Sequence, residues 1–177
     1  DLSKLEASKL VMENVGFELE PVLKKAVQVM KIKAKEKKLD LILDIDLNGI
    51  AGVLKGDPYR MNQILFNLMS NAIKFTEAGK VKVLCQWERN EENRQFLRFE
   101  VSDTGIGMDA ETKNKVFDFG FTTKTDIAGR LGQGMGLSFV KSYMDRMGGD
   151  IVVNSMPKKG TSFFLTIPIK IIEYFEI

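Results

Sequence analysis

Two alternating segments constrain the fold more than any other feature of this 177-residue chain. KVKVLCQWE at 80–88 and FLRFEVSD at 96–103 carry apolar residues at alternate positions, and the polar turn RNEENRQ joins them, which is typical of a β-hairpin. Such a pair has one apolar face, and that face needs a second layer to cover it. DIVVNS and TSFFLTIPI, around the turn MPKKG, predict a closing hairpin, and LDLILDID at 39–46 predicts a further strand.

Amphipathic helices alternate with these strands along the chain. Asp57 and Pro58 are a typical N-cap and first position of one helix, and the pair Gly148-Gly149 is a typical end of another. Because helices and strands are interleaved while several strands join as hairpins, we expect an α+β fold. It would be a two-layer α/β sandwich with a mixed, mostly antiparallel sheet and about three helices on one face. The helical segments are 18–38, 58–75, a short one near 110–117, and 136–147.

The composition excludes several classes of protein and of chemistry. The 44% hydrophobic and 28% charged content fits one well-cored domain, and the net charge of +2 predicts no nucleic-acid partner. The chain contains no histidine, which removes histidine-based activation of nucleophiles and the usual zinc sites. Its single cysteine, Cys85, is expected to be a buried strand residue. The basic run KIKAKEKK at 31–38 closes a helical pattern and is expected to be a solvated helix end.

A polar stripe on the helix after Pro58 is the first sign of a site. Asn67 and Asn71 stand one turn apart, with Gln63 before them and Lys74 after them. Asparagine is a poor residue for the interior of a helix, because its amide competes for backbone hydrogen bonds. Taken alone, the stripe is explained equally well by a solvated helix face. If it binds a metal ion, oxygen ligands without histidine favour Mg²⁺.

Two glycine clusters give a second sign. DTGIGM, with Gly105 and Gly107, follows a predicted strand, and GQGMGL, with Gly132, Gly134 and Gly136, stands at a helix start. Glycines before a helix N-terminus let backbone N–H groups converge on an anion such as phosphate, although each cluster alone also fits a flexible turn. The chain has no GxxxxGK[ST] motif, and GQGMG lacks the spacing and the preceding strand of a dinucleotide-binding fingerprint.

Taken in order, the amide stripe, the DTGIGM turn, the loop FDFGFTTK and the GQGMGL helix start resemble the N, G1, F and G2 boxes of one family. That family is the catalytic ATP-binding domain of sensor histidine kinases, in the superfamily of gyrase, the MutL mismatch-repair proteins and the 90-kDa heat-shock chaperones. The resemblance covers residues 55–168 and implies a Bergerat-type ATP-binding fold. Residues 1–17 resemble the end of the dimerisation hairpin helix with its linker, so we expect the ATP-binding domain at 18–170 and a C-terminal extension at 171–177.

The resemblance implies roles for individual residues. Asn71 matches the asparagine whose side-chain oxygen binds Mg²⁺, Asn67 matches a residue near the phosphates and the metal, and Lys74 matches a lysine near the α- and β-phosphates. Asp103 matches the aspartate that accepts a hydrogen bond from the adenine amino group, and Thr161 resembles a threonine that helps to hold adenine. The other residues with implied nucleotide contacts are Gly105, Gly107, Lys124, Arg130, Gly132, Gly134, Gly136 and Leu137.

One motif departs from the family pattern. Many members carry an arginine after the aromatic residues of the F box, whereas Thr122 stands near that place here. Lys124 and Arg130 are then the cations available for the γ-phosphate, and Lys124 joins Asn67 and Asn71 in the implied catalytic set. The glycine-rich stretch at about 118–133 has no clear periodicity, which predicts a mobile lid that ATP orders.

The residue at position 67 separates the chemistries of the superfamily. Members that hydrolyse ATP place a glutamate there as the base that activates water, and the amide of Asn67 cannot take up a proton near neutral pH. Phosphoryl transfer requires mainly positioning and charge neutralisation. The resemblance therefore implies a protein histidine kinase that binds Mg-ATP and donates the γ-phosphoryl group to a histidine absent from this chain. The alternatives are a nucleotide-binding regulatory module without transfer activity and an ATPase of the same superfamily.

The resemblance also implies partners and a cellular place. The nucleophilic histidine belongs to a dimerisation and phosphoacceptor domain of the same kinase, and the receiver domain of a response regulator takes the phosphoryl group in two-component signal transduction. The fragment is expected to be a monomer that cannot phosphorylate itself, and the full-length protein a dimer. No apolar run approaches the ~20 residues of a membrane span. We expect a cytoplasmic location without membrane contact by this fragment, and leave open a membrane anchor in the full-length protein.

Overall fold

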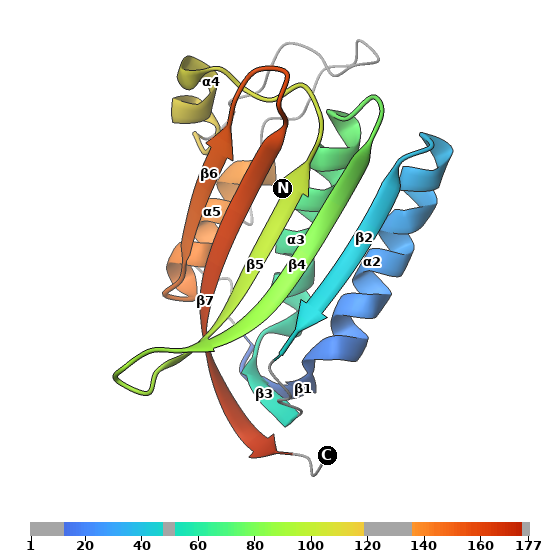
Figure 1. Ribbon diagram of the computed structural model, residues 1–177. Helices are drawn as coiled ribbons and strands as arrows, with labels where there is room; N and C mark the ends of the chain where they lie inside the picture. The colour runs from blue at the N-terminus through green and yellow to red at the C-terminus, as the bar shows by residue number, and fades with distance from the viewer. Residues whose placement is uncertain (1–12, 48–51, 119–135, 175–177) are drawn as a thin grey trace.

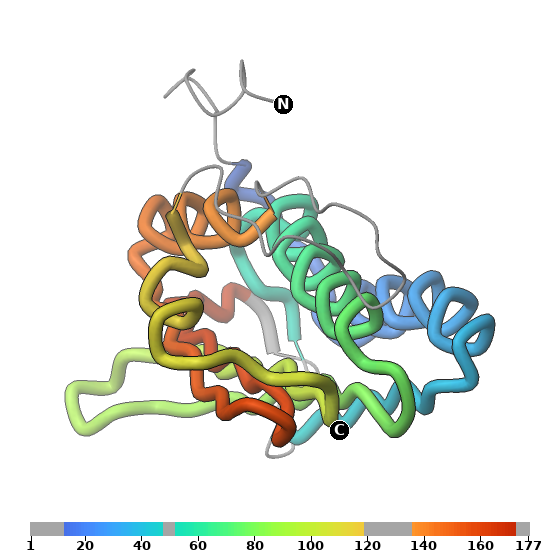
Figure 2. The backbone as a smooth tube through the Cα atoms, turned by 90° about the horizontal axis from the view of Figure 1, so that it is seen from above, coloured from blue at the N-terminus to red at the C-terminus, as the bar shows by residue number. Residues whose placement is uncertain are grey.

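The computed structural model describes residues 13–47, 52–118 and 136–174. They form a curled sheet of seven strands, and the helices α2, α3 and α5 lie against one of its faces (Figure 1, Figure 2). The strand order is β1-β3-β7-β5-β4-β2, with β6 also paired to β7. The elements are β1 (Val15–Glu18), α2 (Leu19–Glu36), β2 (Asp40–Asp46), β3 (Gly52–Gly56), α3 (Pro58–Lys74), β4 (Lys80–Arg89), β5 (Gln95–Asp103), α4 (Ala110–Lys115), α5 (Gly136–Arg146), β6 (Asp150–Ser155) and β7 (Thr161–Tyr174).

The sheet is mixed and mostly antiparallel, which confirms the predicted fold class. β2 runs parallel to β4, and the other strand pairs of the described residues are antiparallel. β7 joins the two parts of the sheet, because its first half pairs with β5 and β6 and its last residues pair with β3.

Three parts of this sheet are absent from the sequence prediction. β1 and β3 have four and five residues and contain glycine, so they are too short to show an alternating pattern. β7 continues to Tyr174, beyond the predicted end at Ile169, where its pairing partner changes from β5 to β3. β1 begins inside the segment 1–17 that we expected to form the end of the hairpin helix and its linker, continues to Glu18, and adds a strand beside β3.

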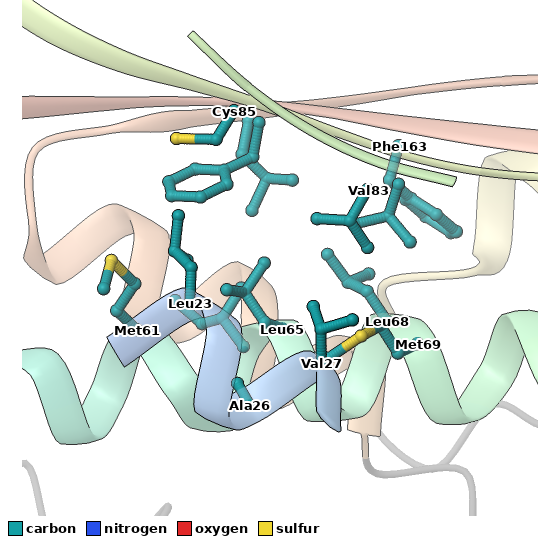
Figure 3. Packing of buried hydrophobic residues seen from close by; sticks show 14 of the residues in the cluster. Leu23, Ala26, Val27, Met61, Leu65, Leu68, Met69, Val83, Cys85 and Phe163 are labelled. Atoms are coloured by element: carbon teal, nitrogen blue, oxygen red, sulfur yellow. The ribbon is translucent and has the colours of Figure 1, made fainter. Parts of the chain in front are cut away.

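The hydrophobic core lies between the sheet and the helices (Figure 3). From α3, side chains such as Leu65 and Leu68 are at most 1% exposed, and Leu23 of α2 packs in the same cluster. Cys85 faces this cluster from β4 and is fully buried, as predicted. Burial raises the pKa of its thiol to about 12, so the thiol stays protonated and acts as a small apolar side chain.

The basic run at 31–38 ends α2, and one of its lysines also fixes α3. Nζ of Lys37 donates hydrogen bonds to the backbone oxygens of Ile73 (2.6 Å) and Lys74 (3.3 Å). These carbonyls belong to the last turn of α3, where unpaired carbonyl groups favour a cation. The lysines before Lys37 are exposed, as expected for a solvated helix end. Lys37 thus ties the end of α2 to the end of α3 that carries the predicted site.

Asp57 fixes the other end of α3, as predicted. Its side chain is buried, and its two carboxylate oxygens accept hydrogen bonds from the backbone N–H groups of Arg60 and Glu13, both at 2.9 Å. The first bond is the helix cap. The second ties the chain just before β1 to the start of the helix.

Replacing this cap tests its contribution to stability. Asp57→Ala leaves two backbone N–H groups without their acceptor, so we expect a loss of about 1–2 kcal/mol in the free energy of unfolding, measured in urea. Asp109→Ala is the matched control, because Asp109 caps the exposed, six-residue helix α4 through a similar bond from Thr112 (2.7 Å). We expect a smaller loss there. Equal losses in the two variants would contradict the role given to Asp57.

Candidate functional site

The first part of the candidate site is the carboxyl end of β5. Asp103 is the last residue of the strand and lies opposite Thr161 of β7. It is two residues after buried Val101, so its side chain is on the same, helix-covered face of the sheet. Its Oδ1 accepts hydrogen bonds from the backbone N–H groups of Gly105 (2.8 Å) and Thr161 (3.3 Å). Burial raises the pKa of the Asp103 carboxyl, and the two hydrogen bonds oppose this shift. The backbone therefore holds this carboxyl group in one orientation at the end of the sheet.

The DTGIG turn after Asp103 is held between α3 and the turn that joins β6 to β7. The backbone N–H of Ile106 donates to the oxygen of Phe75 (3.1 Å), the residue that follows α3. The oxygen of Ile106 accepts a hydrogen bond from the backbone N–H of Lys158 (2.6 Å) in the β6–β7 turn. The turn consequently connects the two structural layers at this end of the molecule.

Gly105 and Gly107 have no room for a side chain. A Cβ on Gly105 would run into the backbone oxygen of Phe75, and a Cβ on Gly107 into the backbone oxygen of Met156. Gly107 also has a φ of +68°, a conformation that favours glycine. The sequence predicted that these glycines let the backbone approach a ligand, and the structure adds a reason within the protein: the turn packs directly on other backbone.

The amide stripe lies on the half of α3 that adjoins this turn. The side chains of Asn67, Asn71 and Lys74 are all partly exposed. Within the described part of the chain, the amides of Asn67 and Asn71 make no side-chain hydrogen bond. The ammonium nitrogen of Lys74 lies 5.2 Å from the centroid of the Phe75 ring. This face of α3 thus presents two amides and one cation next to the carboxyl end of β5.

The start of α5 lies beside Asn67. A Cβ on Gly136 would be 3.7 Å from Oδ1 of Asn67, so the end of the GQGMGL segment reaches the amide stripe. Further along α5, the Tyr143 ring centroid lies 5.4 Å from Cζ of Arg60, near the start of α3. Arg60 also donates a hydrogen bond to Oε1 of Gln63 (2.9 Å). Gln63, which we grouped with the stripe, is therefore held by Arg60, whose guanidinium group also contacts Tyr143 of α5.

Ser155 is a polar residue of this region that the sequence did not predict. It is the last residue of β6, opposite Thr161, and its side chain is buried. Its Oγ bonds to the backbone N–H of Met108, the oxygen of Gly160 and Oγ1 of Thr161. The hairpin around MPKKG could have indicated it, because pairing DIVVNS with TSFF places Ser155 opposite Thr161.

The structure brings a core set of the predicted site residues to one end of the sheet. Asp103 adjoins Thr161, and the half of α3 that carries Asn67, Asn71 and Lys74 adjoins the DTGIG turn. Leu137 is partly buried and packs against the core, and its nucleotide contact stays a prediction. The predicted residues that lie outside the described ranges are Lys124, Arg130, Gly132 and Gly134, together with most of the expected lid.

The donor set of this site suits a nucleotide with Mg²⁺ better than a metal held by protein alone. In residues 13–47, 52–118 and 136–174, no group of three or more aspartate, glutamate or cysteine side chains could hold a metal ion. Mg²⁺ needs few protein ligands when phosphate and water oxygens complete its shell, and the amide oxygen of Asn71 is a suitable ligand of this kind. None of the described helices is long and apolar enough to cross a membrane.

A separate cavity of about 360 Å³ lies at the other end of the sheet. It lies between the start of α2 and strand residues such as Leu97 and Ile171, at the ends of β5 and β7 away from Asp103 and Thr161. Its lining is mostly apolar, whereas polar groups converge at the DTGIG turn. We therefore place the functional site at the turn and not at this cavity.

The fold and the site define a class, a layered α+β domain in which amides, one carboxyl group and glycine turns gather at one end of the sheet. The chain belongs to the family described as histidine kinase-, DNA gyrase B-, and HSP90-like ATPase, which matches residues 56–171. The sensor protein GacS of Pseudomonas syringae pv. syringae is 36% identical over 169 residues, which cover 94% of this chain and 18% of GacS. The histidine-protein kinase BarA of Escherichia coli (strain K12) is 34% identical over 168 residues, again 94% of this chain and 18% of the relative.

Solved structures, among them those of the histidine kinase ThkA, have the same fold. Full-length ShkA in complex with AMPPNP superimposes with a TM-score of 0.79 and 26% identity, over 97% of this chain and 34% of ShkA. The catalytic domain of the histidine kinase ThkA gives 0.71 and 28%, over 89% of this chain and 97% of that domain. ThkA in complex with the response regulator protein TrrA gives 0.73 and 26%, over 94% of this chain and 45% of that chain. These similarities support ATP binding by this chain.

A pair of glycine substitutions separates backbone strain from the contact that the site requires. Gly107 and Gly148 both have positive φ, but a Cβ on Gly148 would meet nothing within 4 Å. We expect Gly148→Ala to lower the free energy of unfolding by about 1–2 kcal/mol and to leave ATP affinity unchanged. Gly107→Ala should cost more, because its Cβ meets backbone, and should weaken ATP binding measured by calorimetry. Identical behaviour of the two variants would show that the contact with Met156 is unimportant.

Proposed function

We propose that this chain is the ATP-binding catalytic domain of a two-component sensor histidine kinase, which donates the γ-phosphoryl group of Mg-ATP to a histidine on a separate dimerisation domain. The observation that carries the proposal is that two kinds of group occur at the same end of the sheet. One is the carboxyl group of Asp103, which the backbone holds in place, and the other is two amides on α3 that have no side-chain partner among the described residues. The histidine kinases GacS and BarA support it as relatives. The chain spans 18% of the length of these relatives, so kinase activity of the whole protein is part of what we propose.

In this proposal the base and the phosphates of ATP occupy different parts of the site. Asp103 accepts a hydrogen bond from the adenine amino group, and Thr161 borders the base. Asn71 is the protein ligand of Mg²⁺, Asn67 lies next to the phosphates, and Lys74 supplies a positive charge near the α- and β-phosphates. When bound, Mg²⁺ neutralises phosphate charge and so assists phosphoryl transfer. The further residues proposed to contact the nucleotide are Gly105, Gly107, Lys124, Arg130, Gly132, Gly134, Gly136 and Leu137.

The partners follow from the chemistry of the acceptor. The chain has no histidine, so the nucleophile comes from a dimerisation and phosphoacceptor domain, for which residues 1–17 are the proposed connection. A receiver domain of a response regulator takes the phosphoryl group afterwards, and the complex of ThkA with TrrA supports a partner of this kind. We propose a dimeric full-length protein whose catalytic domain works in the cytoplasm.

Reconstitution tests the proposed transfer. The chain is fused to a dimerisation hairpin that carries the phosphoacceptor histidine, and γ-labelled ATP is added with Mg²⁺. We expect acid-labile, base-stable phosphate on the fusion protein and none on this chain alone. Asn71→Ala should weaken Mg²⁺-dependent ATP binding by at least about tenfold, because a bond to a charged group is lost, and should abolish the label.

Ser70→Ala is the control, because Ser70 is exposed and precedes Asn71 on the same helix, and it should keep both binding and transfer. ATP binding without any label on the fusion protein would overturn the kinase proposal and favour a regulatory module.

The rate of hydrolysis tests the role of the amide at position 67. A positioned general base typically contributes about 10²–10⁴-fold, and Asn67 cannot serve as one. We therefore expect this chain to bind ATP while hydrolysing it far more slowly than about once per second, measured by release of inorganic phosphate. Asn67→Glu asks whether a base restores hydrolysis. A parent rate of about one per second or faster that Asn71→Ala removes would overturn the proposal and favour the ATPase class.

A further inference from the structure

A row of three polar residues crosses the sheet at the candidate site. Ser155 ends β6, Thr161 begins β7 and Asp103 ends β5, and the strand registers set each opposite the next. Ser155 and Thr161 are 8% and 9% exposed, so their hydroxyl groups need hydrogen-bond partners within the protein. The positions of their two protons can therefore be worked out by counting donors and acceptors.

The hydroxyl of Ser155 has one proton and two lone pairs to offer, and three partners surround it. The backbone N–H of Met108 lies 2.8 Å from Oγ and can only donate. The backbone oxygen of Gly160 lies 3.0 Å away and can only accept. The third partner, Oγ1 of Thr161 at 2.8 Å, can do either.

These partners fix the direction of the bond between the two hydroxyls. The hydroxyl of Ser155 donates its hydrogen bond to the backbone oxygen of Gly160. If it donated to Thr161 instead, a lone pair of Ser155 would face the carbonyl oxygen of Gly160 in a buried place, which is unfavourable. One lone pair of Ser155 then accepts from Met108 and the other accepts from Thr161. The hydroxyl of Thr161 consequently donates its only hydrogen bond to Ser155, so Oγ1 of Thr161 can only accept a hydrogen bond from a ligand.

The same end of the sheet offers a second acceptor. Asp103 uses Oδ1 for the N–H groups of Gly105 and Thr161, and its Oδ2 has no hydrogen bond from the described residues. A ligand that enters here meets lone pairs from both side chains. An amino group satisfies such a pair, whereas a carbonyl oxygen in the same place would face two acceptors and gain no hydrogen bond.

We propose that Ser155 is a positioning residue for nucleobase selectivity: by accepting the hydrogen bond of the Thr161 hydroxyl, it leaves Thr161 as an acceptor beside the acceptor Asp103, and this pair favours the amino edge of adenine and rejects the carbonyl edge of guanine. The inference rests on the proposed function, because it takes this end of the sheet as the place of the base. In this inference Ser155 of β6 does not touch the nucleotide. It acts on selectivity through its hydrogen bond with Thr161.

The test is the ratio of GTP to ATP dissociation constants, measured by calorimetry with Mg²⁺ on this chain. In Ser155→Ala the hydroxyl of Thr161 loses its acceptor and becomes free to donate to guanine, so we expect the ratio to fall by about tenfold, the equivalent of one hydrogen bond. Ser155→Thr keeps the hydroxyl and should restore most of the ratio. Ser162→Ala is the control, because Ser162 is the next residue of β7 and faces the other side of the sheet, and it should keep the parent ratio.

A double-mutant cycle shows whether Ser155 acts through Thr161. Thr161→Val removes the second acceptor and should itself lower the ratio, and Ser155→Ala added to Thr161→Val should then change the ratio no further. If Ser155→Ala does not fold, Thr161→Val alone decides, and a parent-like ratio in it overturns the inference. A parent-like ratio in folded Ser155→Ala also overturns it. Failure of the proposed function differs from both outcomes, because the parent would then bind no ATP or Asp103→Asn would keep the parent ratio.

Discussion

The antiparallel pairing of β5 with β7 is the interaction on which the rest of this structure depends. It places Asp103 directly opposite Thr161, and it turns Leu97, Phe99 and Leu165, each at most 2% exposed, toward the helices. A slip of one residue would expose these side chains and move Asp103 to the other face of the sheet. The burial of the core and the geometry of the candidate site are therefore set by one register, and neither can change without the other.

The same burial sets the rotation of α3 on the sheet. Side chains such as Leu65 and Leu68 are at most 1% exposed, and burial of one side chain of this size contributes about 1.5–3 kcal/mol. An asparagine in a helix costs roughly 0.7 kcal/mol or less, so the apolar face outweighs the two amides. Asn67 and Asn71 are thereby held at fixed places on the helix surface, which makes α3 both a part of the core and a platform for the site.

The parts of the molecule that the sequence predicts are those with long periodic patterns or local motifs. The helix that Asp57 caps and the two hairpins have periods long enough to be recognised. The glycine and amide motifs indicate the site through a family resemblance. β1 and β3 escape prediction because such short strands are defined by their partners and not by a pattern of their own. Ser155 was not predicted because its partners come from two other segments, Met108 and the pair Gly160-Thr161. Gln63 was misassigned because its side chain is bonded to Arg60, a neighbour on the same helix.

The proposed function uses two kinds of oxygen ligand, and their separation explains how one site can hold ATP without consuming it. The carboxyl group of Asp103 is held by two backbone N–H donors, which oppose the rise in its pKa that burial causes and fix the orientation of this acceptor. Amides at positions 67 and 71 can bind a cation without adding negative charge beside a triphosphate, and they cannot take a proton from water. A carboxylate in either place would add repulsion, and a carboxylate at position 67 would also add a base for hydrolysis. Under the proposed function, amides in these places let bound ATP keep its γ-phosphoryl group until a nucleophile arrives from another domain, which is the property that a phosphoryl donor requires.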